Sequence, residues 1–425
     1  MATRLNFFTI VARNYLAYAY VLGDSIKQYQ PDAVFSIFVM DDVTGEHCAD
    51  VEAKGFTAIL PDQIDLPNYK QFVFKYNITE ASTGVKPFVF QHLLNAGFDK
   101  IVYLDPDILC YRPLSEVTDA LDTCSIVLTP HSTSPIDNNL FPDDHLFLIS
   151  GVYNLGFIAL RNDSVAQKFI RWWSQRLENE CLDAQEMSLF VDQKWVDLVP
   201  AYFENVLIFK SLAYNIAYWN LHEREIRRVA DHLRVFPSDE LVAFIHFSGM
   251  LVGENERISK YGPRSPFDDR KHKQRYSFAD RPDLIEPFGD YAQRVTHAGH
   301  ARYVAIPYAF DRYTNGDKIT QLERAMYFAS PEWQADQSDP FAATVGSFWH
   351  ACRTARIKAK VSRGTAQAAP VPTEFGPRYQ IVFRTIQFML RLIVRVLGPE
   401  MYAKFAKYMR EQFLLVNHTF LLRSK

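Results

Sequence analysis

The sequence predicts an α/β protein in which a mixed sheet is flanked by helices and followed by a C-terminal helical extension. Apolar runs of strand length alternate with helical patterns through the first half of the chain. A wholly apolar segment at 101–104 ends at two aspartates, as a buried central strand does when it delivers polar groups at its carboxyl end. The charge is also segregated. Residues 351–425 hold 14 Lys and Arg against three Glu, a net charge of +11, which leaves −14 for residues 1–350.

Each element follows from its pattern along the chain. Strands are predicted at 5–12, 33–40, 56–60, 101–104, 125–130 and 152–160. A first helix is predicted because apolar residues recur every three or four positions at Tyr15, Leu16, Ala19, Leu22, Ile26 and Tyr29. A second helix spans 85–96 and is closed by Gly97, and a third begins near Ser164. A further helical stretch is predicted to contain Met187, Leu189, Phe190 and Asp192-Gln193.

Four parts are expected from composition and charge. They are an α/β domain over 1–267, an accessory region of mixed helix and loop over 268–361, a linker over 362–377, and a basic helical tail over 378–425. The linker is predicted because this segment is rich in Ala, Pro and Gly.

Composition and missing motifs exclude several classes of protein. A chain of 425 residues with 48% hydrophobic residues is neither disordered nor collagen-like. Phosphate-binding glycine loops, a hydrolase elbow and an H-E-x-x-H zinc motif do not occur in the sequence. Five scattered cysteines, no apolar span and no signal-peptide pattern favour a cytoplasmic protein.

The Asp105-Pro106-Asp107 segment is the main candidate for chemistry. Two carboxylates one residue apart repel each other unless a cation neutralises them, and oxygen ligands at this spacing suit Mg²⁺ or Mn²⁺ bridging to a diphosphate. Proline fixes the intervening φ, which would position the pair in advance. The alternative is a simple turn at the end of a strand.

Several segments together resemble one family. IVYLDPDILCYRPL resembles the D-x-D segment of GT-A nucleotide-sugar glycosyltransferases. ARNYLAYAYVLGDSI, VKPFVFQHLL, GVYNLGFIALRN, VDQ and IHFSG resemble, in the same order, that family's nucleotide-binding turn, basic helix, F-N-x-G strand, D-Q pair and late histidine. This order is similar to the retaining glycosyltransferase family 8. The resemblance covers about residues 5–265 and implies a GT-A fold, a Rossmann-like mixed sheet.

The resemblance also implies roles for single residues. Asp105, Asp107 and His246 would bind Mn²⁺, or else Mg²⁺. Asn154 and Asp192 would contact hydroxyls of the donor sugar, and Gln193 would lie near the anomeric carbon; these three form the implied catalytic set. Asn14, Tyr15 and Lys86 would complete the donor site. Each residue also has a structural alternative, such as a hydrogen-bonded core histidine for His246, a helix-surface pair for Asp192 and Gln193, or a helix start for Lys86.

The implied function is transfer of a sugar from a nucleotide-diphosphate donor, most simply a UDP-sugar, to a glycan or lipid-linked glycan. Bacterial-type surface polysaccharide synthesis would use such an enzyme. A sugar-nucleotide nucleotidyltransferase and an inert glycan-binding scaffold on the same fold are the alternatives. No nucleic-acid partner is expected.

The basic tail predicts attachment to a membrane surface. Gln380, Arg384, Gln387, Arg391 and Arg395 form one polar stripe in an otherwise apolar helix, which stops at Gly398-Pro399 before a second amphipathic helix. Such helices lie in the interface of an anionic membrane, here its inner face. A helical hairpin, intramolecular or forming a homodimer, is the alternative.

Overall fold

A computed structural model describes residues 3–136, 140–254, 256–261, 276–336, 338–358 and 377–412. Contacts divide the chain into two compact units. The first contains Met1–Tyr69 and Ile78–Ala309, and the second contains Lys70–Asn77 and Phe310–Lys425. The boundaries predicted at 267, 361 and 377 stay predictions, and residues 262–275 and 359–376 lie outside the described part.

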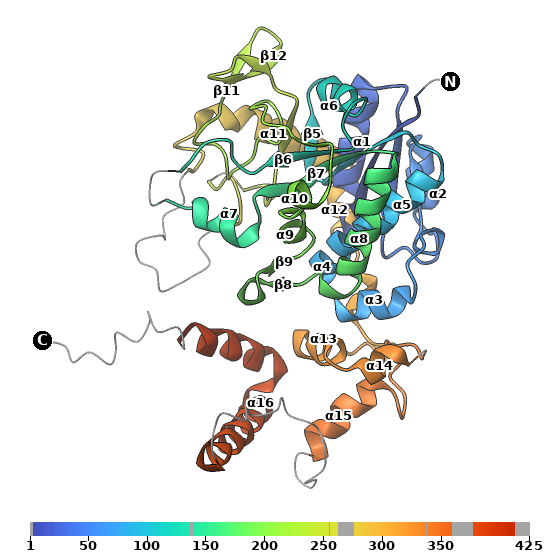
Figure 1. Cartoon of the computed structure of the whole chain (residues 1–425), viewed down its shortest axis with the longest axis vertical. Coiled ribbons are helices and arrows are strands. Elements are labelled where there is room, and N and C mark those ends of the chain that lie inside the picture. Colours follow the sequence, from blue (N-terminus) through green and yellow to red (C-terminus); the bar gives the residue numbers. More distant parts are fainter. Residues whose placement is uncertain are drawn as a thin grey trace, which may run out of the picture. The chain divides into compact units, whose positions relative to one another are not determined.

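A seven-stranded mixed sheet forms the centre of the first unit (Figure 1). Its strand order is β10-β6-β7-β4-β1-β2-β3, so β4, which ends at the two aspartates, is the middle strand. All neighbours are parallel except β7, which is antiparallel to both β4 and β6. The strands are β1 (Leu5–Val11), β2 (Val34–Val39), β3 (Thr57–Ile59), β4 (Lys100–Leu104), β6 (Ile126–Pro130), β7 (Tyr153–Arg161) and β10 (Val206–Ile208).

Both faces of this sheet are covered, which explains why its strands are continuously apolar. Alternate residues of one strand point to opposite faces. Phe7 joins the core that includes helix α1 (Leu16–Tyr29), whereas the ring of Phe8 lies 4.7 Å from Phe90 of helix α5 (Lys86–Asn95). Helix α8 (Ser164–Glu180) packs on α5. The Asp163 side chain begins α8 by accepting hydrogen bonds from the free amides of the first turn.

The first unit also contains the longer helix α11 (Ile285–His297). Its remaining helices are short: α2 (Cys48–Ala53), α4 (Ile78–Gly84), α6 (Ser115–Ala120), α7 (Asp144–Ser150), α9 (Gln193–Val196), α10 (Val199–Tyr202) and α12 (His300–Tyr303), with 3₁₀ turns at η1 (Arg13–Tyr15), η2 (Pro61–Gln63), η3 (Gln185–Met187) and η4 (Pro282–Leu284). The turn η5 (Ala309–Asp311) begins at the last residue of the first unit and continues into the second.

A second strand pair completes the carboxyl end of the central sheet. Strand β14 (Phe244–His246) runs antiparallel to β5 (Ile108–Cys110), which follows β4 directly. Two further groups of strands are antiparallel: β8 (Asp183–Ala184) with β9 (Leu189–Phe190), and β11 (Glu225–Val229) with β12 (His232–Phe236) and β13 (Glu240–Leu241).

The second unit is helical. It contains most of α3 (Tyr69–Lys75), α13 (Gln321–Phe328), α14 (Pro331–Ala335), α15 (Phe348–Lys358) and α16 (Pro377–Gln412). The buried guanidinium of Arg324 donates to the carbonyls of Val73, Phe74 and Tyr76, which have no partner within α3. A distant arginine thereby ends helix α3 and binds it to α13.

The predicted α/β class and the C-terminal helical extension are confirmed. The predicted strands and the helices α1, α5 and α8 are present to within a few residues. The break at Gly398 is confirmed too, since this residue takes φ 75° between two helical parts of α16. One prediction is wrong. Leu189 and Phe190 form strand β9 and not a helix, because Ser188 and Val191 adopt left-handed backbone conformations on either side.

Within the described residues, no helix is both long and apolar enough to cross a membrane. The polar residues 137–139 and the end of the predicted tail, 413–425, lie outside the described part of the chain.

Candidate metal and donor site

The two aspartates are held in place by the backbone. The Asp105 amide donates to the Gly156 carbonyl of β7 (2.8 Å), so Asp105 extends the pairing of β4. The Ile108 amide then donates to the Asp105 carbonyl (3.2 Å), which closes a turn with Pro106 at its second position. The Asp107 carbonyl accepts from the Phe247 amide (2.8 Å). Both carboxylates therefore sit on a turn that is fixed at three points.

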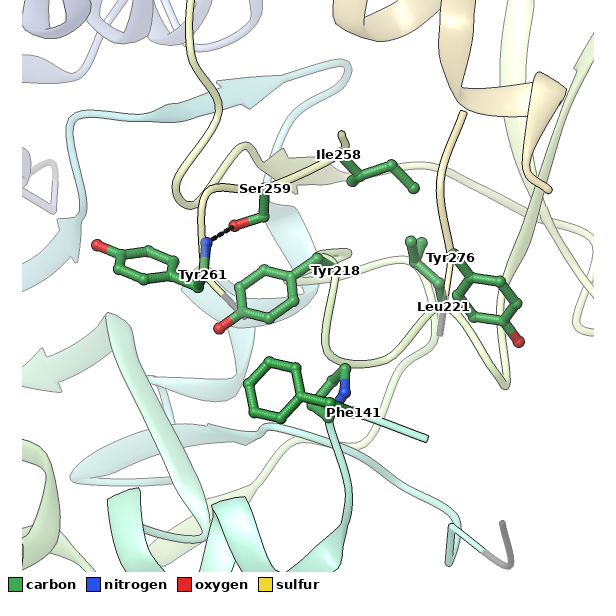
Figure 2. A pocket seen from close by; sticks show the side chains of 8 residues that line it. Phe141, Tyr218, Leu221, Ile258, Ser259, Tyr261 and Tyr276 are labelled. Carbon is green, nitrogen blue, oxygen red and sulfur yellow. Dashed lines mark hydrogen bonds between the residues drawn. The ribbon is translucent and has the colours of Figure 1, made fainter. Parts of the chain in front are cut away.

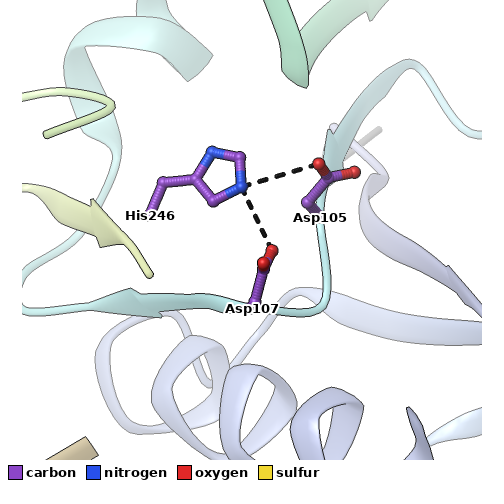
Figure 3. A group of neighbouring side chains, drawn as sticks. All are labelled: Asp105, Asp107 and His246. Atoms are coloured by element: carbon purple, nitrogen blue, oxygen red, sulfur yellow. Dashed lines mark ion pairs between the residues drawn. The ribbon is translucent and has the colours of Figure 1, made fainter. Parts of the chain in front are cut away.

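His246 lies opposite these carboxylates because β14 pairs with β5 and places His246 against Ile108. Its Nε2 is 3.1 Å from Asp107 Oδ1 and 3.6 Å from Asp105 Oδ2, and Figure 3 shows this one ring nitrogen facing both carboxylates. Ligand atoms of the three residues lie within 4.8 Å of one another. The histidine side chain is only 3% exposed, whereas the aspartates reach the surface at 20% and 31%.

Gly156 makes room for this histidine. A Cβ on Gly156 would lie 2.4 Å from Cε1 and 2.8 Å from Nδ1 of His246, far inside any tolerated contact. The glycine of the predicted N-x-G strand is thus required by the packing of the imidazole against β7.

The electrostatics of the cluster reflect both burial and the charges of its own residues. Burial raises the pKa of the Asp105 carboxyl above its usual range, and this outweighs the nearby positive charge of Lys86. Burial alone would lower the pKa of His246, but the carboxylates of Asp107 and Asp105 raise it. The Tyr103 hydroxyl donates to Asp105 Oδ1 at 2.6 Å and orients that carboxylate. Two acids facing one imidazole form a site with excess negative charge, which a cation would neutralise.

Lys86 and Asp192 form a buried ion pair. Lys86 Nζ donates to Asp192 Oδ2 (2.5 Å) and to the Leu155 carbonyl (2.8 Å), and it lies 4.2 Å from the centre of the Tyr103 ring. The two side chains are 1% and 2% exposed. Burial raises the pKa of Asp192 although Lys86 opposes the shift. The alternative of an exposed pair on a helix surface is therefore wrong for Asp192.

Asn154 and Gln193 are buried together behind the aspartates. Gln193 Oε1 accepts from the Leu155 amide (3.0 Å), and its Nε2 donates to the Ser150 carbonyl (2.7 Å). Asn154 Nδ2 lies 3.4 Å from the same Gln193 oxygen. The contacts of these two amides hold the start of β7, and their predicted roles at the sugar stay predictions.

The first strand-to-helix turn carries two other predicted donor residues. Tyr15 lies in the 3₁₀ turn η1 with its ring stacked on Tyr18, 4.6 Å between centroids, and not on the buried face of α1 as the periodicity suggested. Burial, and next the charge of Asp107, raises the pKa of Tyr15. Asn14 Oδ1 is buried with no hydrogen-bond partner among the described residues.

Three site residues escaped the sequence reasoning. Asn215, His131 and Trp219 contact the predicted residues: Asn215 Oδ1 is 3.2 Å from His246 Nδ1, His131 Nε2 is 3.2 Å from Asn154 Nδ2, and the Trp219 ring lies edge-on to His246 at 5.1 Å. The one signal in the sequence is the run LAYNIAYWN, where polar amides interrupt aromatic residues. That pattern does not indicate what the amides contact.

Trp219, which packs on His246, also contacts a small aromatic pocket whose lining side chains are shown in Figure 2. The Tyr218 ring is 5.1 Å from Trp219 and 6.1 Å from Tyr261. Phe141 and Leu221 line the same pocket.

Comparisons with known proteins find distant relatives. No protein-family model matches the chain. Two uncharacterised proteins of Bacillus subtilis (strain 168) are similar: YfnF is 24% identical over 251 residues, which are 58% of this chain and 82% of YfnF. YfnD is 23% identical over 257 residues, 59% of this chain and 80% of YfnD.

Solved structures with a similar arrangement are glycosyltransferases. A galactosyltransferase, LgtC, in complex with donor and acceptor sugar analogues, is 17% identical and matches 71% of this chain and 97% of its own, with a TM-score of 0.40. GlyE of Streptococcus pneumoniae TIGR4 is 13% identical over 73% of this chain and 67% of its own (TM-score 0.40). The bifunctional WbbM is 14% identical over 70% and 52% (TM-score 0.38). At these values the similarities assign neither an activity nor a substrate to this chain.

Proposed function

We propose that this chain is a GT-A glycosyltransferase of the family 8 type that uses a divalent metal and transfers a sugar from a nucleotide-diphosphate donor. The observation that carries the proposal is the cluster of Asp105, Asp107 and His246 at the carboxyl end of the central strand. In open α/β sheets, ligands bind outside the carboxyl ends of the strands. The similarity to glycosyltransferase structures agrees with this reading.

The donor set fits Mn²⁺, or else Mg²⁺. It offers two carboxylates and one imidazole, a mixture of oxygen and nitrogen that suits Mn²⁺ better than the all-oxygen preference of Mg²⁺. Three protein ligands leave further positions for oxygens of a diphosphate. A cation bound there would supply positive charge to the leaving diphosphate.

The protein's own groups would place the donor. Tyr15 and Asn14 of the first strand-to-helix turn are proposed to contact the base of the donor; the buried Asn14 oxygen has no hydrogen-bond partner among the described residues. Asp192, held by Lys86, is the carboxylate proposed to contact the sugar, with Gln193 next to it near the anomeric carbon. We propose a UDP-sugar donor and retention of the anomeric configuration.

The acceptor is proposed to be a glycan or lipid-linked glycan of bacterial-type surface polysaccharide synthesis. Helix α16 supports a location at the inner face of a membrane. It carries seven Lys and Arg against two Glu, and its described side chains include exposed apolar ones at Ile386, Phe388, Met389, Leu392, Val396, Leu397 and Met401. An apolar surface with basic flanks fits an anionic lipid interface.

A donor panel tests the enzymatic proposal. Purified protein is incubated with UDP-, GDP- and CDP-sugars and Mn²⁺, and release of the nucleotide diphosphate and of the sugar is measured. We expect turnover of one donor class and its loss in EDTA, because the leaving diphosphate would lose its counter-charge. Turnover that survives exhaustive chelation contradicts the metal site, and an inverted product in NMR contradicts the family 8 mechanism. Pyrophosphate-dependent release of a nucleoside triphosphate would identify a nucleotidyltransferase, and no turnover at all an inert scaffold.

A further inference from the structure

A chain of buried polar side chains runs from His246 into the protein interior. His246 Nδ1 lies 3.2 Å from Asn215 Oδ1, and Asn215 Nδ2 lies 3.1 Å from Asn154 Oδ1. Asn154 Nδ2 in turn lies 3.2 Å from His131 Nε2. All four residues are at least nine-tenths buried, and Asn215 is completely buried. Because these four side chains are buried away from solvent, each hydrogen-bond donor among them has to meet an acceptor within the protein.

The backbone fixes the polarity of this chain. The Gly156 amide can only donate, and it lies 3.2 Å from Asn154 Oδ1, so this side-chain atom is the oxygen. The Asn154 oxygen can only accept, so Asn215 must present its Nδ2 to it. The Oδ1 of Asn215 therefore faces His246. The same Nδ2 also reaches the Thr129 hydroxyl at 3.2 Å.

The other end of the chain gives the same polarity. The Leu155 amide donates to Gln193 Oε1, so Asn154 must present its Nδ2 to that oxygen and to His131. His131 Nδ1 then faces the Val152 carbonyl at 3.3 Å and carries the proton. Both backbone anchors thus assign Asn154 the same orientation.

The polarity of this chain determines which ring nitrogen of His246, the candidate metal ligand, carries the proton. Because Asn215 presents an oxygen, His246 Nδ1 carries a proton, and the ring is fixed with Nε2 toward Asp105 and Asp107, as Figure 3 shows. A ligating histidine of known metal sites is oriented in the same way, through a hydrogen bond from its other nitrogen.

We propose that Asn215 is a positioning residue which selects the tautomer and the ring orientation of His246 for metal binding, with Asn154 as its anchor. This assignment rests on the metal site of the proposed function. Asparagine suits the position because the backbone there has φ 55°, which asparagine tolerates, and because its amide accepts from one neighbour and donates to another. Asn154 has both side-chain atoms engaged in this chain, and the proposal gives it a role at the metal and not at the donor sugar.

Metal affinity of single variants tests the assignment in the full-length protein. Asn215→Gly removes the amide at a position where glycine adopts the same backbone without strain. Asn205→Gly is the matched control, since Asn205 also has a left-handed backbone (φ 56°) but is exposed and away from the cluster. Mn²⁺ affinity is measured by titration calorimetry and folding by the thermal unfolding midpoint.

We expect Asn215→Gly to weaken Mn²⁺ binding about 10–100-fold, as the loss of such an orienting partner typically does, while Asn205→Gly leaves it unchanged. Asn215→Asp keeps an oxygen toward His246 Nδ1 but loses the donor to Asn154 Oδ1, so its Mn²⁺ affinity should lie between those of Asn215→Gly and the unaltered protein. Saturating Mn²⁺ should restore turnover of Asn215→Gly, because only the population of bound metal has changed. A packing defect would not respond to metal in this way.

Two results overturn the assignment, and they are distinguishable. If the unaltered protein binds neither Mn²⁺ nor Mg²⁺, the metal site fails and the role of Asn215 with it. If the unaltered protein binds Mn²⁺ and Asn215→Gly binds it equally well, the role of Asn215 alone fails. Should Asn215→Gly not fold, Asn215→Ser replaces it, since its shorter side chain cannot reach both His246 and Asn154. Unchanged affinity in Asn215→Ser refutes the assignment equally.

Discussion

Replacing Gly156 by alanine tests the geometry of the metal cluster with a single methyl group. The new Cβ would lie 2.4 Å from His246 Cε1 and 2.8 Å from Asn154 Oδ1, and since real Cβ contacts stay above 3.0 Å, the imidazole must retreat by at least 0.6 Å with β7 in place. Metal sites tolerate ligand displacements of only about 0.2 Å. His246 should therefore stop acting as a ligand although it remains in the chain.

The expected magnitudes follow from that displacement. Losing a ligand weakens metal binding more than losing a residue that orients the ligand, so Mn²⁺ affinity should fall by at least about 100-fold. An added methyl group in a packed interior also destabilises a protein by about 1–3 kcal/mol. Titration calorimetry with Mn²⁺ and thermal unfolding measure the two effects separately.

Gly289 provides the control. It lies within α11, and a Cβ added there meets nothing within 4 Å. Gly289→Ala should leave Mn²⁺ affinity unchanged and stabilise the fold by about 0.5–1 kcal/mol, because alanine restricts the unfolded chain and favours helix. Wild-type Mn²⁺ affinity in Gly156→Ala would refute the reasoning, since it would mean that His246 either does not lie over Gly156 or does not bind the metal.

Three further predictions concern other parts of the chain. Asp107→Ala should abolish transfer with little change in the unfolding midpoint, whereas Asp119→Ala, at an exposed aspartate of α6, should retain activity in the same donor assay. Lys86→Met should lower the free energy of unfolding by about 3–5 kcal/mol at neutral pH, because it leaves Asp192 buried without its partner. Burial already raises the pKa of Asp192, so stability should return as the pH is lowered through that raised pKa; denaturant unfolding at several pH values measures this, and a pH-independent loss would contradict the assignment. The full-length protein should float with anionic but not with neutral liposomes, and truncation after Pro377 should end flotation. Equal flotation of both proteins would exclude α16 as the anchor and leave the helical hairpin or homodimer as its role.

The aspartates and the central strand were predictable because their signal is local. A run of buried apolar residues that ends at two carboxylates marks a central strand and its end wherever the rest of the fold lies, and β4 confirms this. The break at Gly398-Pro399 is local in the same way, since neither residue continues a helix. His246 was found only through the order of motifs along the chain. Nothing within the apolar run around it distinguishes a metal ligand from a core histidine.

The error around Leu189 and Phe190 shows where local signals fail. A cluster of apolar residues at Met187, Leu189 and Phe190 favoured a helix, but the structure forms the short strand β9 between left-handed backbone positions at Ser188 and Val191. This backbone path directs Asp192 inward to Lys86, so contact with a distant lysine outweighs the weak helical signal.

The sequence by itself determined which residues are buried and where the strands end, because burial in a strand or helix repeats with a period that a single segment displays. The tertiary structure alone decided which polar groups meet. Lys86 and Asp192 are 106 positions apart, and Asn215 and Asn154 are 61 apart. Their contacts depend on β7 running antiparallel beside β4 and on β14 pairing with β5. Hydrogen bonds act over about 3 Å and leave no periodic trace in a sequence, so the orientation of His246 emerges only when these strands are placed together.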